Sequence, residues 1–195
     1  MRIAMLALAT LSLTACQQAG EADDTPSDEI QLQETPNTDP NPPGVVRLMG
    51  DGVQVTGAAG TSLAFTSPQG AVEAELARAL GDPTGRASND ECGAGPVDTT
   101  SFNGGLKLNF QKGRLVGWVL DTDKGPETRD IATVDRIAPG SSAADLGAAY
   151  DVSPVEGSTL GDEFTTQSGI SGFYEQQGEA KQVGMLYAGT TCFFR

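Results

Sequence analysis

Residues 105–120, with the sequence GLKLNFQKGRLVGWVL, carry the clearest structural signal in the chain. The first half of this stretch alternates apolar with polar residues, which is the two-residue period of a strand that buries one face. The apolar positions are Leu106, Leu108 and Phe110. A turn at residues 111–113 leads into a second apolar run, residues 115–120, which contains the only tryptophan, Trp118. The stretch therefore predicts an antiparallel hairpin, and we expect Trp118 to lie in the core.

Upstream of this hairpin, the sequence predicts short strands followed by a helix. Residues 45–57 contain two β-rich runs around a Gly-Asp-Gly turn, which is typical of a hairpin, and strand character continues to Ser67. An apolar residue then recurs at every fourth position, which indicates one face of a helix. These positions are Val72, Leu76 and Leu80. Gly81 and Pro83 follow and are expected to end the helix.

The second half of the chain predicts a similar order of elements. Ser142 is a candidate N-cap for a second helix, with Asp145 three residues later, and a pair of strands is predicted on either side of a turn at Gly178. An alignment of the halves pairs three positions at offsets of 70, 64 and 64: Leu76 with Leu146, Gly105 with Gly169, and Phe110 with Tyr174. Because the identities are few, an internal duplication and two coincidental hairpins both remain open.

A helix followed by a meander, found twice, predicts an α+β fold with helices packed on one face of an antiparallel sheet. We expect this fold to occupy residues 44–195 as a single globular domain, which is long enough to bury one hydrophobic core. In one form of the prediction the domain consists of two helix-plus-meander repeats.

Residues 1–15 have the features of a signal peptide. Arg2 is the only charged residue before Cys16, and residues 3–13 are almost entirely apolar but too few to span a bilayer stably. The Leu-Thr-Ala sequence directly before Cys16 resembles the bacterial lipobox. The resemblance implies cleavage before Cys16 and lipid on its sulfur and its amine. The alternative is an ordinary signal peptide with a cysteine nearby.

Residues 16–43 are expected to form the lipidated cysteine and a disordered tether. Residues 17–43 contain seven acidic residues and five prolines, with no Lys, Arg or aromatic residue. Such a composition cannot bury enough apolar surface to offset the entropy lost on folding. We expect this segment to hold the domain away from the membrane.

The charge of the chain argues against several classes of partner. The formal net charge is −14, and residues 44–195 carry 11 basic and 19 acidic residues. An acidic protein gains nothing from counterion release on nucleic acid, and anionic lipid headgroups repel it. We therefore expect no nucleic-acid partner, membrane association through the lipid on Cys16 alone, and an envelope protein as the candidate partner.

Two cysteines remain once Cys16 is assigned to lipidation. Cys92 and Cys192 are an even pair in an exported chain, for which a disulfide is the default. Asp90 and Glu91 beside Cys92 disfavour a reactive thiolate. Two buried free thiols are the main alternative. A Cys92–Cys192 bridge would tie the C-terminal strand to the first half of the domain.

The sequence excludes several chemistries. It contains no histidine, which removes Ser-His-Asp and Cys-His catalysis and histidine-based zinc sites. We expect no metal, no cofactor and no catalytic residue. Asp162 and Glu163 are interpreted as surface charges because neighbouring strand residues face opposite ways. A histidine-free hydrolase remains the alternative and would need a cleft with two carboxyls roughly 5–10 Å apart. Trp118 and the pair Phe193-Phe194 are expected to be core residues.

Four short motifs carry a family resemblance. They are ECGAGP at residues 91–96, GW at residues 117–118, GSTLGDEF at residues 157–164, and GTTCFFR at residues 189–195. They resemble motifs of uncharacterised proteobacterial lipoproteins, some of which are named aspartate-semialdehyde dehydrogenase. That name has no support here, because the chain lacks the histidine base and a G-x-G-x-x-G turn.

The order of a helix, an LG-x-P exit and strands also resembles the fold of the BamE outer-membrane assembly lipoproteins, and its tandem form resembles β-lactamase inhibitor protein. Gln17 after the lipidated cysteine resembles the pattern of outer-membrane lipoproteins. The resemblance implies an outer-membrane anchor with the domain facing the periplasm, and a binding or assembly function without enzymatic activity.

Overall fold

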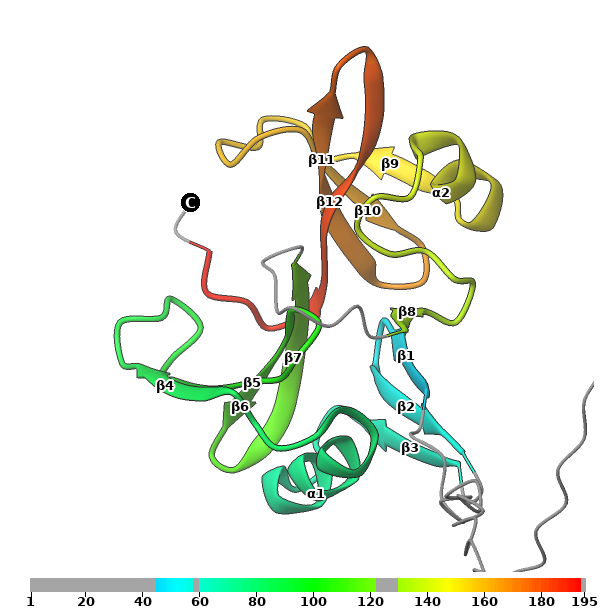
Figure 1. Ribbon diagram of the computed structural model, residues 1–195. Helices are drawn as coiled ribbons and strands as arrows, with labels where there is room; N and C mark the ends of the chain where they lie inside the picture. Colours follow the sequence, from blue (N-terminus) through cyan, green and yellow to red (C-terminus); the bar gives the residue numbers. More distant parts are fainter. Residues whose placement is uncertain (1–44, 58–59, 122–129, 194–195) are drawn as a thin grey trace, which may run out of the picture. The chain divides into compact units, whose positions relative to one another are not determined.

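An eight-stranded antiparallel sheet built around the 105–120 hairpin is the main element of the fold (Figure 1). The computed structural model describes residues 45–57, 60–121 and 130–193, which all belong to one compact unit, Asp39–Arg195. The strand order in this sheet is β4-β5-β6-β7-β12-β11-β10-β9. The strands are β4 (Gly85–Asn89), β5 (Val97–Ser101), β6 (Leu106–Gln111), β7 (Arg114–Asp121), β9 (Val152–Pro154), β10 (Glu163–Thr166), β11 (Ile170–Gln177) and β12 (Ala180–Gly189).

A second, four-stranded sheet and two helices complete the described fold. The small sheet has the order β3-β2-β1-β8. Its strands are β1 (Val45–Met49), β2 (Gly52–Thr56), β3 (Thr61–Ala64) and β8 (Ile131–Thr133). The helices are α1 (Gln69–Leu80) and α2 (Ala143–Ala149). Neither described helix combines the length and apolar content needed to cross a membrane.

The local predictions for both helices are confirmed. The predicted apolar face of α1 is buried, and the helix ends at Gly81, whose φ of 84° suits glycine. Ser142 caps α2, since its Oγ accepts a hydrogen bond from the Asp145 N–H at 3.0 Å. The predicted hairpin turn also forms, with Lys112 and Gly113 both in the left-handed region between β6 and β7.

The predicted fold class is confirmed only in its coarse form. The described residues combine α-helix with a largely antiparallel sheet, as expected, but strands dominate and the two helices are short. The prediction also missed the second sheet, in which β1 pairs in parallel with β8. β8 has only three residues and its partner lies more than 80 positions earlier, so its pairing leaves no local period in the sequence.

One hydrophobic core joins the two sheets and both helices. Trp118 on β7 is fully buried in it, which confirms the prediction for this residue. Its indole N–H donates a hydrogen bond to the Met49 carbonyl oxygen on β1 at 2.8 Å. This bond links the two sheets and satisfies the one polar group of a buried tryptophan.

The two halves of the large sheet are built alike. α1 precedes the β4–β7 meander and α2 precedes the β9–β12 meander, and the last strands of the two meanders, β7 and β12, pair at the centre. Each central hairpin has a register shift at the same place, between Asn109 and Phe110 in the first and between Phe173 and Tyr174 in the second. These positions are 64 residues apart, as in the sequence alignment.

A polar network attaches α1 to the first meander. The side chain of Glu73 is only 17 % exposed. It accepts hydrogen bonds from Gln69 and Thr100, both at 2.8 Å, and pairs with Arg86 at 2.7 Å. Burial raises the pKa of this carboxyl, but the hydrogen bonds from Arg86, Gln69 and Thr100 together outweigh burial, so its pKa lies below the ordinary value of 4.5.

We expect Glu73 to make the stability of this fold depend on pH. Because its pKa is lower in the folded than in the unfolded chain, its contribution is complete above pH 4.5 and is lost as the pH falls through the folded pKa. Glu73→Gln should lower the free energy of unfolding by on the order of 1 kcal/mol at pH 7, and by less at pH 3. Urea unfolding at both pH values measures this. Glu75→Gln on the same helix is the control, and an equal loss for both variants would contradict the expectation.

Candidate functional site

The face of the large sheet that points away from the core is the candidate functional surface. Side chains alternate along each strand, so while Leu108 and Leu186 point into the core, their neighbours point to the opposite side. We call this side the outer face and define it by six cross-strand neighbours. They are Thr99, Asn109, Val119, Glu163, Phe173 and Tyr187.

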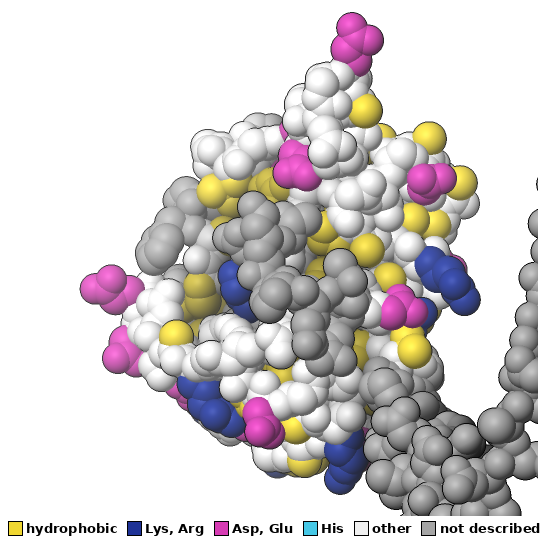
Figure 2. All heavy atoms as spheres, viewed as in Figure 1, with side chains coloured by type: hydrophobic (Ala, Val, Ile, Leu, Met, Phe, Trp, Pro, Cys, Tyr) yellow, Lys and Arg dark blue, Asp and Glu magenta, His cyan; other side chains and the backbone are white. Residues whose placement is uncertain are grey.

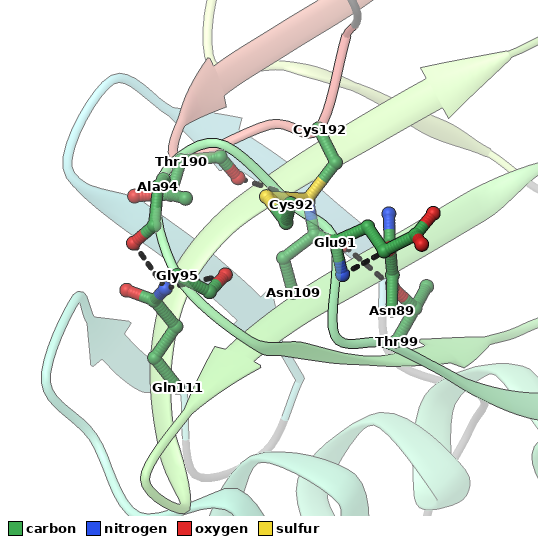
Figure 3. Close-up of a disulfide and its surroundings, with 10 residues drawn as sticks. All are labelled: Asn89, Glu91, Cys92, Ala94, Gly95, Thr99, Asn109, Gln111, Thr190 and Cys192. Carbon is green, nitrogen blue, oxygen red and sulfur yellow. Dashed lines mark hydrogen bonds between the residues drawn. A yellow bond between two sulfur atoms is a disulfide. The ribbon is translucent and has the colours of Figure 1, made fainter.

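Over the first meander, the C-terminal segment of the chain lies on the outer face. The Thr190 N–H donates to the Val116 carbonyl oxygen at 2.8 Å, and the Asn109 side-chain amide donates to the Thr190 carbonyl oxygen at 2.9 Å (Figure 3). Gly117 lies directly beneath, where an added Cβ would collide with the Thr190 backbone. A glycine on β7 is therefore required for this close approach.

The same segment is joined to the β4–β5 loop. Cys92 and Cys192 form a disulfide with their Cα atoms 5.2 Å apart (Figure 3). The Gln111 side chain holds the loop from beneath, donating to the carbonyl oxygens of Ala94 at 2.8 Å and Gly95 at 3.3 Å. The structure thus brings together the two cysteines that the sequence singled out, and places their bridge across the outer face.

Over the second meander, the outer face contains a buried carboxylate. Glu163 is 3 % exposed, and its two oxygens accept hydrogen bonds from Ser158, at 2.6 Å, and from the Tyr187 hydroxyl. The interpretation of Glu163 as a surface charge is therefore wrong. Its neighbour Asp162 is exposed and pairs with Lys181 at 2.7 Å, as strand alternation requires. The sequence could not show that hydroxyl donors would compensate the burial of Glu163.

Three aromatic rings cluster beside Glu163. The ring centroids are 5.7 Å apart for Phe173 and Tyr187, 5.5 Å for Phe173 and Phe193, and 5.0 Å for Tyr187 and Phe193. Phe193 is half-buried in this cluster rather than in the core, and Phe194 lies outside the described residues. The two-residue spacing of Phe173 from Ser171 and Glu175 on a strand was the only sequence signal for this outward-facing ring.

A groove of about 390 Å³ lies next to this cluster. Its apolar walls are Leu160, Phe173, Met185 and Phe193, and its acidic walls are Asp121 and Glu175. The Lys107 Nζ lies 3.9 Å from the Asp121 Oδ2, and the Glu175 carboxylate accepts a hydrogen bond from the Gln182 side chain at 2.8 Å. Figure 2 shows hydrophobic side chains next to acidic ones around the β11–β12 hairpin at the top of the view.

All four motifs contribute residues to the outer face. Residues 91–96 and 189–193 are joined by the disulfide, residues 117–118 lie beneath the joined segment, and residues 157–164 contribute Glu163 to the same face. Cys16 and the rest of residues 1–44 lie outside the described residues. Within the described ranges, no group of three or more Cys, Asp or Glu side chains is arranged to hold a metal ion.

Comparisons with protein-family models, with curated proteins and with solved structures found no match to this chain.

Proposed function

We propose that this protein is a membrane-anchored envelope lipoprotein that acts as a binding or assembly module without enzymatic activity. The observation that carries the proposal is the outer face, where a groove with aromatic and acidic walls lies beside a segment fixed by a disulfide. Concave sites with mostly apolar walls and a few polar groups are the usual form of a binding site. The lipobox resemblance and the acidic tether support an anchor on Cys16.

We further propose that residues 44–195 form one domain made of two helix-plus-meander repeats. The matching order of elements and the matching register shifts support a duplication over a coincidence. The anchored protein would face the periplasm from the outer membrane, in line with Gln17 after the cysteine.

The hydrolase alternative finds less support in the site. Glu163 is a buried carboxylate of the outer face, but both of its oxygens already accept hydrogen bonds from hydroxyl groups, which favours a structural role. It is also not among the residues of the groove wall. We therefore favour the binding function.

Site-specific crosslinking in intact cells tests the binding function. A photoreactive residue at position 173 on the outer face should capture a specific envelope protein, whereas one at exposed Asp82 beyond the end of α1 should not. Equal capture from both positions, or none from position 173 in any growth condition, would contradict the proposal.

Cys16→Ser should abolish the membrane anchor. Two or more acyl chains give stable membrane attachment, so we expect the native protein to sediment with membranes and the variant to lose its lipid entirely. Membrane fractionation and intact mass measure both effects, and Ala19→Ser serves as the control. An unmodified residue 16 in the native protein would refute the anchor.

A further inference from the structure

The two central hairpins correspond residue by residue. β6 maps onto β11 at an offset of 64, and β7 maps onto β12 at an offset of 68, with the register shift at the same place in both. This mapping relates outer-face positions of the first hairpin to positions of the second. Asn109 corresponds to Phe173, Gln111 to Glu175, Val116 to Gly184, and Gly117 to Met185.

In the first hairpin, these positions already bind backbone groups of other segments of the chain. The Asn109 side chain binds the Thr190 carbonyl oxygen, and the Gln111 side chain binds the backbone of the β4–β5 loop (Figure 3). The Val116 carbonyl oxygen accepts a hydrogen bond from the Thr190 N–H. All of these contacts go to carbonyl oxygens or N–H groups of the covering segments. The irregular hairpin therefore serves as a platform on which the C-terminal segment and the β4–β5 loop lie.

In the second hairpin, the same positions have different chemistry. Phe173 and Glu175 replace the two amides, and both line the groove together with Gly184 and Met185. The extra strand residue here is Gly184, and the Glu175 side chain lies in the space that its missing side chain leaves, where an added Cβ would be 3.2 Å from the Glu175 Cβ and Cγ. An aromatic ring beside a carboxylate favours side-chain recognition over the backbone recognition of the first hairpin.

The charge of residues 143–193 indicates the sign of the charge on the ligand. Residues 143–193 contain seven acidic side chains and one basic one, Lys181, whereas residues 81–121 contain five acidic and four basic ones. Lys181 itself lies with its ammonium 4.0 Å from the centroid of the Tyr174 ring, so this hairpin already holds one cation over an aromatic ring. Both features favour a basic ligand.

We propose that the groove on the second hairpin binds an extended segment of a partner protein that carries lysine or arginine next to an apolar side chain. Glu175 pairs with the cation, while Phe173 and Phe193 contact the apolar side chain and the aliphatic stem of the basic one. The partner segment lies over the second hairpin as the C-terminal segment lies over the first. This inference rests on the proposed binding function and specifies its partner.

Calorimetric titration of the full-length protein with three synthetic peptides tests the inference. The peptides GRLRLRG, GQLQLQG and GELELEG share their glycine and leucine positions and carry basic, neutral and acidic residues at the other three. We expect the arginine peptide to bind at least about tenfold more tightly than the glutamate peptide. Glu175→Gln should weaken its binding about threefold to tenfold, and Phe173→Ala should weaken it at least about tenfold.

Glu179→Gln is the matched control, because it removes the same charge from the same hairpin outside the groove. Circular dichroism checks that each variant folds, and exposed Glu175 keeps the test valid if Phe173→Ala does not fold. The inference is overturned if no arginine-peptide binding appears at about 1 mM, if the glutamate peptide binds equally, or if Glu179→Gln weakens binding as much as Glu175→Gln. If the peptide test fails but the crosslinking experiment at position 173 still captures an envelope protein, the proposed binding function stands and only the basic ligand is rejected.

Discussion

The double variant Cys92→Ser, Cys192→Ser is expected to lose about 2–5 kcal/mol of unfolding free energy. The bridge closes a loop with a sequence separation of 100 residues, for which the chain-entropy model gives a limit of about 4.7 kcal/mol. The loss also has a native-state part, because the bridge holds the C-terminal segment against Asn109 and the aromatic cluster. Both parts lower the unfolding free energy of the double variant.

Urea unfolding of the full-length protein measures this loss. The oxidised protein, the reduced protein and the double variant should be compared at one pH, with Cys16→Ser as a control that removes a cysteine outside the loop. The reduced protein should match the double variant. If reductant leaves the unfolding midpoint unchanged, the bridge does not stabilise the fold in solution.

Trp118→Ala is expected to destabilise the protein by about 3–5 kcal/mol, since it removes the largest fully buried side chain. The variant also leaves the Met49 carbonyl oxygen without the indole N–H that joins the two sheets. Trp118→Phe helps to separate the two effects, because it removes the hydrogen bond while keeping most of the apolar volume. It should cost about 1–3 kcal/mol.

Thermal unfolding followed by circular dichroism suits this series, because the fluorescence of the protein comes from the same tryptophan that is replaced. Val134→Ala is the matched control. Val134 is 47 % exposed, and its truncation should change the stability by less than about 0.5 kcal/mol. A Trp118→Ala effect as small as that of the control would show that the indole does not join the sheets as described.

Local sequence signals were sufficient for the elements with a clear period. The hairpin of β6 and β7, the buried face of α1 and the Ser142 cap each depend on residues within a few positions of one another. The register shifts of the two hairpins are also 64 residues apart, the offset between Gly105 and Gly169, and both glycines adopt a positive φ, 81° and 83°. The two hairpins share this backbone geometry although few of their residues are identical.

The features that the sequence did not reveal depend on distant partners. Burial of Glu163 requires the hydroxyl of Tyr187, 24 positions later, and the β1–β8 pairing joins strands from different parts of the chain. The aromatic cluster combines β11, β12 and the C-terminal segment. Period and composition describe one element at a time, so they cannot show which side chains meet across a sheet.

The strand order of the large sheet has a consequence for folding kinetics. Every neighbouring pair in this sheet is consecutive along the chain except β7 and β12, whose register joins Asp121 to Met185. Each meander can therefore assemble through short loop closures, which are fast, while one long-range closure joins them. Within this sheet, the slow search is therefore concentrated at this single seam, and each meander can form before the two join.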